Sequence, residues 1–173
     1  MTGQKILVDF SDSDRSEWSA VNDGVMGGVS QGGIRRTNEG TGVFAGTLSL
    51  EHNGGFASVR AALGRHDLSA WAGLELRVRG DGRTYQLRLR SDDRFDNIAY
   101  AADFMTHDGE WTVIHIPFHQ FRPRFRGRTL ADVPPLDISR IQHLAFMLAD
   151  GKPGPFLLEI DFVRTWQPNT IDS

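Results

Sequence analysis

The sequence contains no cysteine, which excludes both a disulfide framework and a thiolate metal site in this 173-residue chain. It also lacks any apolar run of about 18 residues, the length that a membrane-spanning helix needs, so we expect no integral membrane segment. Positive charge is not in excess, because 22 acidic residues outnumber 19 lysines and arginines and leave a net charge of −3. We therefore expect no nucleic acid among its partners.

The first ten residues contain neither the apolar segment of a secretory signal nor the arginine-rich pattern of a mitochondrial presequence. Together with the missing cysteines, which suit a reducing compartment, this predicts a cytoplasmic location. The length suits a single domain over residues 1–173, with a polar tail from about residue 167.

Short apolar stretches separated by turns rich in glycine and proline run along most of the chain, and no long amphipathic helix interrupts them. Strands are predicted at 5–10, 43–50, 56–63, 74–90 (as a hairpin), 98–105, 111–117, 141–148 and 156–166. In the strand at 56–63, alternation places Ser58 and Arg60 on the polar face. About nine or ten short strands indicate an all-β fold, namely a predominantly antiparallel β-sandwich or jelly roll.

The segment 74–90 predicts a β-hairpin, because Asp81-Gly82 is a typical two-residue turn. A turn there pairs residues of like polarity at every position and places Glu75 opposite Arg88. The polar face of this hairpin carries Glu75, Arg77, Arg79, Gln86, Arg88 and Arg90. Two interpretations stay open: a solvated face whose charges cancel, or a surface, joined by Ser58 and Arg60, that binds an acidic or hydroxyl-rich partner.

Five glycines crowd the stretch from Val21 to Gly33, which predicts either an ordered, irregular loop or a bulged entry into a strand. Its segment Gly28-Val29-Ser30-Gln31-Gly32 matches the G-x-S-x-G nucleophile motif, but no helical pattern follows, so the serine is better explained as a turn residue. The glycine spacing also departs from the dinucleotide-binding pattern. We therefore expect a non-enzymatic protein with no catalytic residue and no cofactor.

Two segments carry residues of the types that bind metal ions. Asp92, Asp93 and Asp96 lie in a short oxygen-rich loop that is either a calcium site or a plain solvated loop, since the EF-hand pattern is missing. His115 and His119 are four residues apart but belong to a predicted strand, so they would not share a helical face as zinc ligands do. No transition-metal site is expected.

Phenylalanine and arginine interleave between residues 118 and 128. Such a pattern can stack on bases or contact anionic lipid, but it is more typical of a loop whose aromatic side chains seal the core while its arginines lie at the rim. The acidic overall charge favours the second interpretation.

Several motifs together resemble those of the NADH:ubiquinone oxidoreductase intermediate-associated protein 30 family. They are Asn22-Asp23-Gly24-Val25-Met26-Gly27-Gly28-Val29-Ser30, Asn53-Gly54-Gly55-Phe56, Ile116-Pro117-Phe118 and Gly154-Pro155-Phe156. The resemblance implies a galactose-binding-like β-sandwich. It also implies a function, because the mitochondrial members are assembly factors that bind intermediates of respiratory complex I and catalyse no reaction.

Two functions follow from these observations. The first is a non-enzymatic module that contacts a protein partner, with assembly intermediates of a respiratory complex as the implied partners. The alternative is a module that binds carbohydrate or another small ligand. For that alternative, stacking surfaces would come from Trp18, Trp71, Trp111, Trp166 and Tyr85. Large aromatic residues more often fill the core of such a sandwich.

The predicted binding residues belong to the glycine-rich loop and to scattered arginines. They are Asn22, Asp23, Met26, Ser30, Arg60, Arg79, Arg88 and Arg126. The arginines are candidate contacts for anions or carboxylates. A structural alternative is equally open, in which the loop residues cap backbone donors and the arginines pair with nearby acids.

Overall fold

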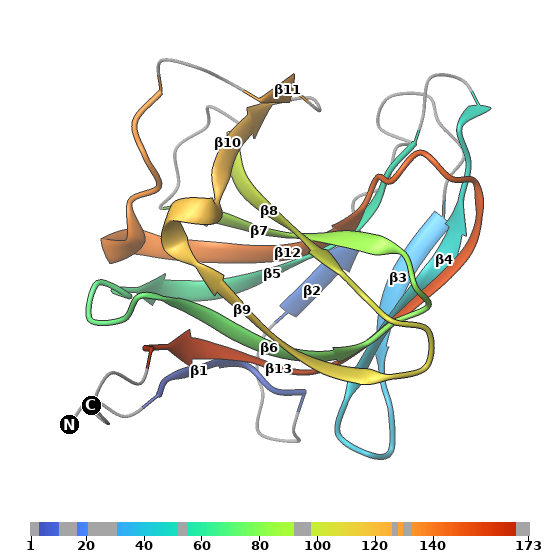
Figure 1. Cartoon of the computed structure of the whole chain (residues 1–173), viewed down its shortest axis with the longest axis horizontal. Coiled ribbons are helices and arrows are strands. Elements are labelled where there is room, and N and C mark those ends of the chain that lie inside the picture. Colours follow the sequence, from blue (N-terminus) through green and yellow to red (C-terminus); the bar gives the residue numbers. More distant parts are fainter. Residues whose placement is uncertain are drawn as a thin grey trace.

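The structure is a computed structural model that describes residues 4–10, 17–20, 31–51, 55–91, 98–125, 128–129 and 133–168. These residues form two antiparallel sheets (Figure 1). The six-stranded sheet has the order β3-β4-β13-β6-β9, with β1 paired to β13, and the seven-stranded sheet has the order β11-β10-β8-β7-β12-β5-β2. The predicted all-β sandwich is therefore confirmed.

Strands of the two sheets are intermixed in sequence order, as their bounds show. The six-stranded sheet contains β1 (Ile6–Val8), β3 (Gln31–Arg36), β4 (Gly42–Leu48), β6 (Gly73–Arg79), β9 (Trp111–Pro117) and β13 (Gly154–Trp166). The seven-stranded sheet contains β2 (Glu17–Ala20), β5 (Ala57–His66), β7 (Thr84–Ser91), β8 (Ala99–Met105), β10 (Arg122–Phe125), β11 (Arg128–Thr129) and β12 (Ile141–Leu148). Two short 3-10 helices, η3 (Phe118–Gln120) and η4 (Ile138–Arg140), precede β10 and β12.

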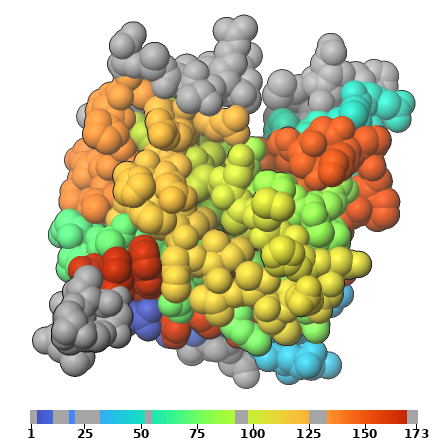
Figure 2. Space-filling model, viewed as in Figure 1, coloured from blue at the N-terminus to red at the C-terminus, as the bar shows by residue number. Residues whose placement is uncertain are grey.

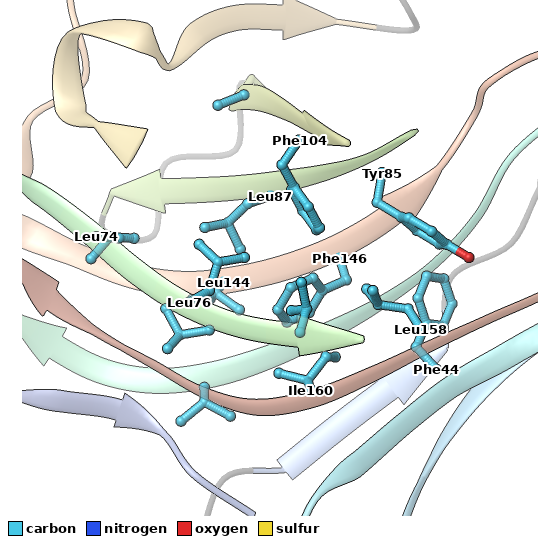
Figure 3. Close-up of a cluster of buried hydrophobic side chains, with 14 of the residues drawn as sticks. Phe44, Leu74, Leu76, Tyr85, Leu87, Phe104, Leu144, Phe146, Leu158 and Ile160 are labelled. Carbon is cyan, nitrogen blue, oxygen red and sulfur yellow. The ribbon is translucent and has the colours of Figure 1, made fainter. Parts of the chain in front are cut away.

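The core lies between the two sheets and is filled by the alternate residues of each strand. Leu74 and Leu76 of β6 point toward Leu87 of β7 and Leu144 of β12, and all four side chains are fully buried (Figure 3). Because every second residue of a strand faces this core, the residues between them form the outer face of each sheet. In the space-filling view, β9 and the segment leading to β10 cover the centre of the visible face (Figure 2).

The predicted hairpin between 74 and 90 is wrong. β6 pairs with β13 and β9 in one sheet, whereas β7 pairs with β12 and β8 in the other. Two strands that face each other across a core show the same matched alternation as two paired strands, so polarity could not distinguish the arrangements. As a result, Arg79 and Arg88 lie on opposite outer faces, and Glu75 pairs with Arg164 and His115 instead of Arg88.

The crossing from β6 to β7 is held by the Asp81 carboxylate. It accepts hydrogen bonds from the Tyr85 hydroxyl at 3.0 Å, the Leu157 amide at 2.8 Å and the Arg83 amide at 3.2 Å. Arg83 in turn donates from two guanidinium nitrogens to Asp150, at 2.7 and 2.9 Å. Burial, followed by the charge of Asp81, raises the pKa of Tyr85, which keeps its hydroxyl a donor. Asp81 thus connects strands of both sheets.

Two glycines permit this crossing. Gly82 has a φ of 90°, a conformation that favours glycine over other residues. At Gly80, a side chain would place its Cβ only 2.4 Å from the Cβ of Thr106. Thr106 also donates to the Arg83 carbonyl at 2.7 Å and accepts from the Gly82 amide at 3.1 Å, so the glycines allow the backbone to approach it closely.

β10 at 122–125 occurs where the sequence predicted a loop. β3 at 31–36 begins within the glycine-rich stretch, for which the sequence left a loop and a bulged strand entry open. β3 begins directly after Ser30, which lies outside the described residues. A strand and not a helix therefore follows the serine of the G-x-S-x-G match, which disagrees with the strand-to-helix geometry that this motif requires.

We expect Asp81→Ala to lower the free energy of unfolding by about 2–4 kcal/mol, because it leaves the buried Tyr85 hydroxyl and the Leu157 amide without their acceptor. Chemical denaturation with far-UV circular dichroism measures the effect. Glu51→Ala, at an exposed position, is the control and is expected to change stability by less than about 0.5 kcal/mol. Equal effects of the two substitutions would contradict the role assigned to Asp81.

Candidate functional site

The outer face of the six-stranded sheet is a network in which each central arginine meets a carboxylate. Arg77 lies 2.8 Å from Asp161, and Arg79 lies 2.6 Å from Glu159. In the same network, Glu75 accepts from Arg164 at 2.5 Å and from His115 at 2.9 Å. These pairs agree with the structural alternative for Arg79, in which its guanidinium neutralises a neighbouring acid.

Aromatic rings on this face are covered by the same charged side chains. The guanidinium groups of Arg77 and Arg79 lie 4.3 and 4.9 Å from the ring centre of Trp111. Trp166 stacks on His115 with the ring centres 4.6 Å apart. Neither tryptophan therefore presents a bare ring for stacking on a sugar.

The other aromatic candidates pack on the core. Trp18 stacks on Phe10 at 5.5 Å and on Phe146 at 6.3 Å, and Tyr85 is fully buried. Trp71 is partly buried against the same core cluster. The aromatic side chains considered for carbohydrate binding are thus engaged in packing or in contacts with charged groups.

The outer face of the seven-stranded sheet is organised differently. Strand register places Arg60 of β5 beside Ala145 of β12, Arg88 of β7 beside Ala145 and Ala101 of β8, and Arg122 of β10 beside Ala101. Arginine and alanine therefore alternate across five neighbouring strands. We call Arg60, Arg88 and Arg122, together with Arg90, Arg124 and His143 of the adjacent row, the arginine face.

Arg88 is the central and most buried member of the arginine face. Burial is the main cause that lowers the pKa of Arg88 to about 10, and the charges of Arg90, Arg124 and Arg60 lower it further. Its Nε is buried without a hydrogen-bond partner in the described structure, and one terminal nitrogen donates only to the Met147 sulfur, at 3.2 Å. This guanidinium lacks the carboxylate that each arginine in the opposite network has.

His143, which lies beside Arg90 in the register of β12 and β7, is a second polar member of the arginine face. Its Nδ1 is buried and has no described hydrogen-bond partner. Burial, followed by the charges of Arg60 and Arg90, lowers the pKa of His143, so the ring is neutral at pH 7. Asp103 of β8 lies opposite Gln86 on the same face, is exposed, and takes part in none of the described ion pairs.

Two depressions meet at Arg90. A small hollow of about 20 Å³ is lined by Ser58, Arg60, Arg88, Arg90, His143 and Met147. The lining of a larger cavity of about 240 Å³ includes Arg90, Ile98, Tyr100, Val133, Pro134 and the ion pair of Asp137 with Arg140. The Tyr100 hydroxyl donates to the Pro134 carbonyl at 2.6 Å and fixes one wall of this cavity. Charged and apolar surfaces are therefore contiguous.

The structure brings some predicted site residues together and separates others. Arg60 and Arg88 share one face, whereas Arg79 lies on the opposite sheet. The remaining predicted residues, Asn22, Asp23, Met26, Ser30 and Arg126, lie outside the described residues, as does the acidic loop at 92–97. In the part of the chain that the structure describes, no three His, Asp or Glu residues are grouped as metal ligands.

The prediction omitted three members of the arginine face. Arg122 and Arg124 were assigned to a loop rim, and His143 was not considered. The signal was present in part, because alternation along 141–148 puts His143, Ala145 and Met147 on the side opposite the buried Leu144 and Phe146. Only the pairing of β10 with β8 places Arg122 in the row.

We expect stability to fall in acid as Glu75 and Glu159 are protonated. Burial opposes ionisation of both, but hydrogen bonds from His115 and Arg164, and from Thr41 and Arg79, outweigh it and hold each pKa below the ordinary value of 4.5. The resulting stability is complete above about pH 5 and is lost as pH falls through the folded-state pKa values.

Glu159→Gln should therefore show a shallower loss of unfolding free energy between about pH 5 and pH 3 than the unmodified chain. Denaturant titrations across this range measure the slope, and Glu51→Gln provides the control. An unchanged slope in Glu159→Gln would contradict the assignment.

We expect Arg88→Met to raise the free energy of unfolding at pH 7 by about 0.5–2 kcal/mol, because it removes a buried charge surrounded by like charges. Arg77→Met, which breaks the pair with Asp161, is the matched control and should give no gain. Thermal and chemical denaturation measure both. A loss of stability in Arg88→Met would contradict this account, because it would show that the Arg88 guanidinium makes stabilising interactions in the folded chain.

Solved structures with this fold include carbohydrate-binding modules. A family 11 module of the cellulase Lic26A-Cel5E of Clostridium thermocellum superposes with a TM-score of 0.72 at 20% identity, over 97% of this chain and 96% of that chain. The same type of module in complex with a β-1,3-1,4-mixed-linked tetrasaccharide gives 0.70 at 20% identity, over 96% of this chain and 97% of that one. At these identities the likeness establishes the fold alone.

Sequence relatives carry a different name. The chain is 31% identical over 170 residues to "Complex I intermediate-associated protein 30, mitochondrial" of Mus musculus, covering 87% of this chain and 52% of that protein. It is 29% identical over 181 residues to the protein of the same name in Drosophila melanogaster, covering 91% and 61%. The chain thus spans little more than half the length of these relatives.

Among the described residues, none of the helices has the length and apolar character needed to span a membrane. The relatives' names say mitochondrial, so the comparisons do not support the predicted cytoplasmic location. The family model for Complex I intermediate-associated protein 30 matches residues 8–160, which is most of the sequence. The chain therefore belongs to the complex I intermediate-associated protein 30 family.

Proposed function

We propose that this chain is a non-enzymatic binding module that takes part in assembly of respiratory complex I by contacting protein partners. The observation that carries the proposal is the family match over residues 8–160, together with relatives that are named for association with complex I intermediates. Because the chain spans about half the length of the mouse relative, the role of the whole protein is part of the proposal.

The geometry supports a binding role over a catalytic one. Chemistry by a protein side chain needs a nucleophile or acid–base pair held within hydrogen-bond distance and aimed at an open site. The described His–carboxylate contact, between His115 and Glu75, is shared with Arg164 and packed beneath Trp166, so it serves the ion-pair network. The arginine face offers charge and shape for contact and presents no such pair.

Carbohydrate binding is the second candidate function. It is favoured by the fold shared with a family 11 module whose structure contains a tetrasaccharide. The register positions of the arginine face carry no Trp, Tyr or Phe among the described residues, so a sugar would have to bind there through hydrogen bonds without ring stacking. A glycan array followed by calorimetry tests this candidate, and no signal from any sugar would remove it.

The location of the protein belongs to the same proposal. Action on complex I intermediates requires access to the compartment where the complex is assembled, whereas the sequence alone predicted the cytoplasm. Fractionation of cells from the source organism, with detection by an antibody, distinguishes the two and identifies the compartment in which partners are to be sought.

We expect deletion of the gene, in a source organism that has complex I, to lower NADH:ubiquinone reductase activity and to leave partly assembled subcomplexes on native gels. Affinity capture of the tagged chain should recover complex I subunits from the unmodified strain. Normal activity and a normal native-gel pattern after deletion would contradict the proposed function. A catalytically unrelated respiratory complex measured in parallel provides the control.

A further inference from the structure

We propose that the arginine face binds the carboxylates of an acidic segment of a partner protein, with Arg60, Arg88 and Arg122 as the principal contacts. This inference rests on the proposed function, since it names the partner chemistry and the surface through which the contact is made. It extends the sequence prediction, which included Arg60 and Arg88 but did not place Arg122 beside them.

The first argument comes from the contrast between the two outer faces. On the six-stranded sheet, Arg77, Arg79 and Arg164 each lie within 2.8 Å of a carboxylate oxygen. On the seven-stranded sheet, Arg60, Arg88 and Arg122 take part in none of the described ion pairs. Among the described residues, the arginine face therefore has an excess of positive charge that an incoming carboxylate would neutralise.

The second argument is geometric. Arginines of this row are two strands apart, so their backbones are separated by about 10 Å. Ala145 lies between Arg60 and Arg88 and lines the hollow, so a small group can approach the sheet there. A guanidinium presents its N–H donors in a planar fork that fits a carboxylate with two hydrogen bonds. Successive acidic side chains of an extended segment can therefore meet successive arginines.

The size of the hollow argues against a sugar ring and for a small anionic group. Its volume of about 20 Å³ is close to that of one water-sized site, which suits the end of a side chain. Arg88 and His143 both line it, and the Arg88 Nε and His143 Nδ1 are buried without described hydrogen-bond partners. A carboxylate seated there would accept a hydrogen bond from the Arg88 Nε–H that is otherwise unsatisfied.

The adjoining cavity favours a protein segment over a nucleic acid. It shares Arg90 with the hollow and is walled in part by Ile98, Val133 and Pro134, so an apolar side chain can enter next to a bound carboxylate. The net charge of −3 also disfavours a long polyanion, which would meet repulsion away from this face.

Binding of defined peptides to the full chain tests the inference directly. A fluorescent peptide of alternating glutamate and leucine is titrated and followed by anisotropy, with a peptide of alternating glutamine and leucine as the charge control. We expect the glutamate peptide to bind at least tenfold more tightly. The affinity of the glutamate peptide should fall as the salt concentration is raised, because exposed charges are screened. Equal binding of both peptides would overturn the inference.

Substitutions place the contact on the molecule. Arg60→Gln combined with Arg88→Gln should weaken binding of the glutamate peptide at least tenfold, whereas Arg77→Gln combined with Arg79→Gln, on the opposite sheet, should change it less than twofold. Denaturation curves establish that each variant folds, and Arg88→Met serves as a second variant if the double substitution fails to fold. Equal effects of the two pairs would overturn the inference.

The same anisotropy assay tests whether other anions bind the arginine face. Inorganic phosphate, a short single-stranded DNA and vesicles containing phosphatidylserine are tested as competitors at matched ionic strength. Competition weaker than that of unlabelled glutamate peptide supports an acidic protein segment. Tighter binding of any of the three, lost in the Arg60→Gln, Arg88→Gln variant, would overturn this assignment and identify a phosphate group as the occupant.

Complementation separates this inference from the proposed function. In the deletion strain, the Arg60→Gln, Arg88→Gln variant should fail to recover complex I subunits on affinity capture, and the Arg77→Gln, Arg79→Gln variant should recover them. Full rescue by the first variant, where deletion itself blocks assembly, would overturn the inference and leave the proposed function intact. If deletion has no effect on complex I, the proposed function is contradicted. The peptide assay then still tests whether the arginine face binds an acidic segment.

Discussion

The distribution of charge on this molecule depends on the crossing from β6 to β7. The Asp81 carboxylate accepts hydrogen bonds from Tyr85 of β7, in the seven-stranded sheet, and from Leu157 of β13, in the six-stranded sheet. This connection sends two successive arginine-bearing strands to opposite sides of the core. Had the same residues formed a hairpin, Glu75 would lie opposite Arg88 and their charges would cancel on one surface. The crossing removes that possibility and leaves the two faces to be neutralised separately.

In the part of the chain that the structure describes, the arginines at the centre of the six-stranded sheet are paired with carboxylates, whereas Arg60, Arg88 and Arg122 of the seven-stranded sheet take part in no described ion pair. On the first, Glu159 is only 7% exposed and accepts from both Arg79 and Thr41, so its charge is satisfied. On the second, Arg88 is buried among positive neighbours, a condition that disfavours the charged form and lowers its pKa. Stability alone favours an apolar residue at this position. The proposed acidic segment would supply the counter-ion that this guanidinium lacks among the described residues, in keeping with the general conflict between stability and function.

Much of the fold was predictable because it depends on local alternation. The strand at 141–148 was predicted with the bounds that the structure has, since Leu144, Phe146 and Leu148 are buried and the residues between them are not. The prediction for the start of β3 stayed open between a loop and a bulged strand entry, because Gly32 and Gly33 interrupt the alternation. β10 was missed because Pro123 is unusual in a strand. The partnership between strands was not predictable in the same way. It is set by contacts across the core and by the capped turn at Asp81, and neither is visible in a pattern that records only polarity.

That difference explains why the candidate site was predicted only in part. Arg60 and Arg88 were identified as single residues, but their union with Arg122 requires the order β5-β12-β7-β8-β10, which joins segments far apart in the sequence. Carbohydrate-binding modules share the fold, and the outer positions of this sheet hold the guanidinium groups of arginines and the methyl groups of alanines. A shared sheet supplies a shaped platform, while the side chains that alternate onto its outer face determine which chemistry it recognises. On this platform the chemistry is that of a cation, so the fold alone does not make a sugar its ligand.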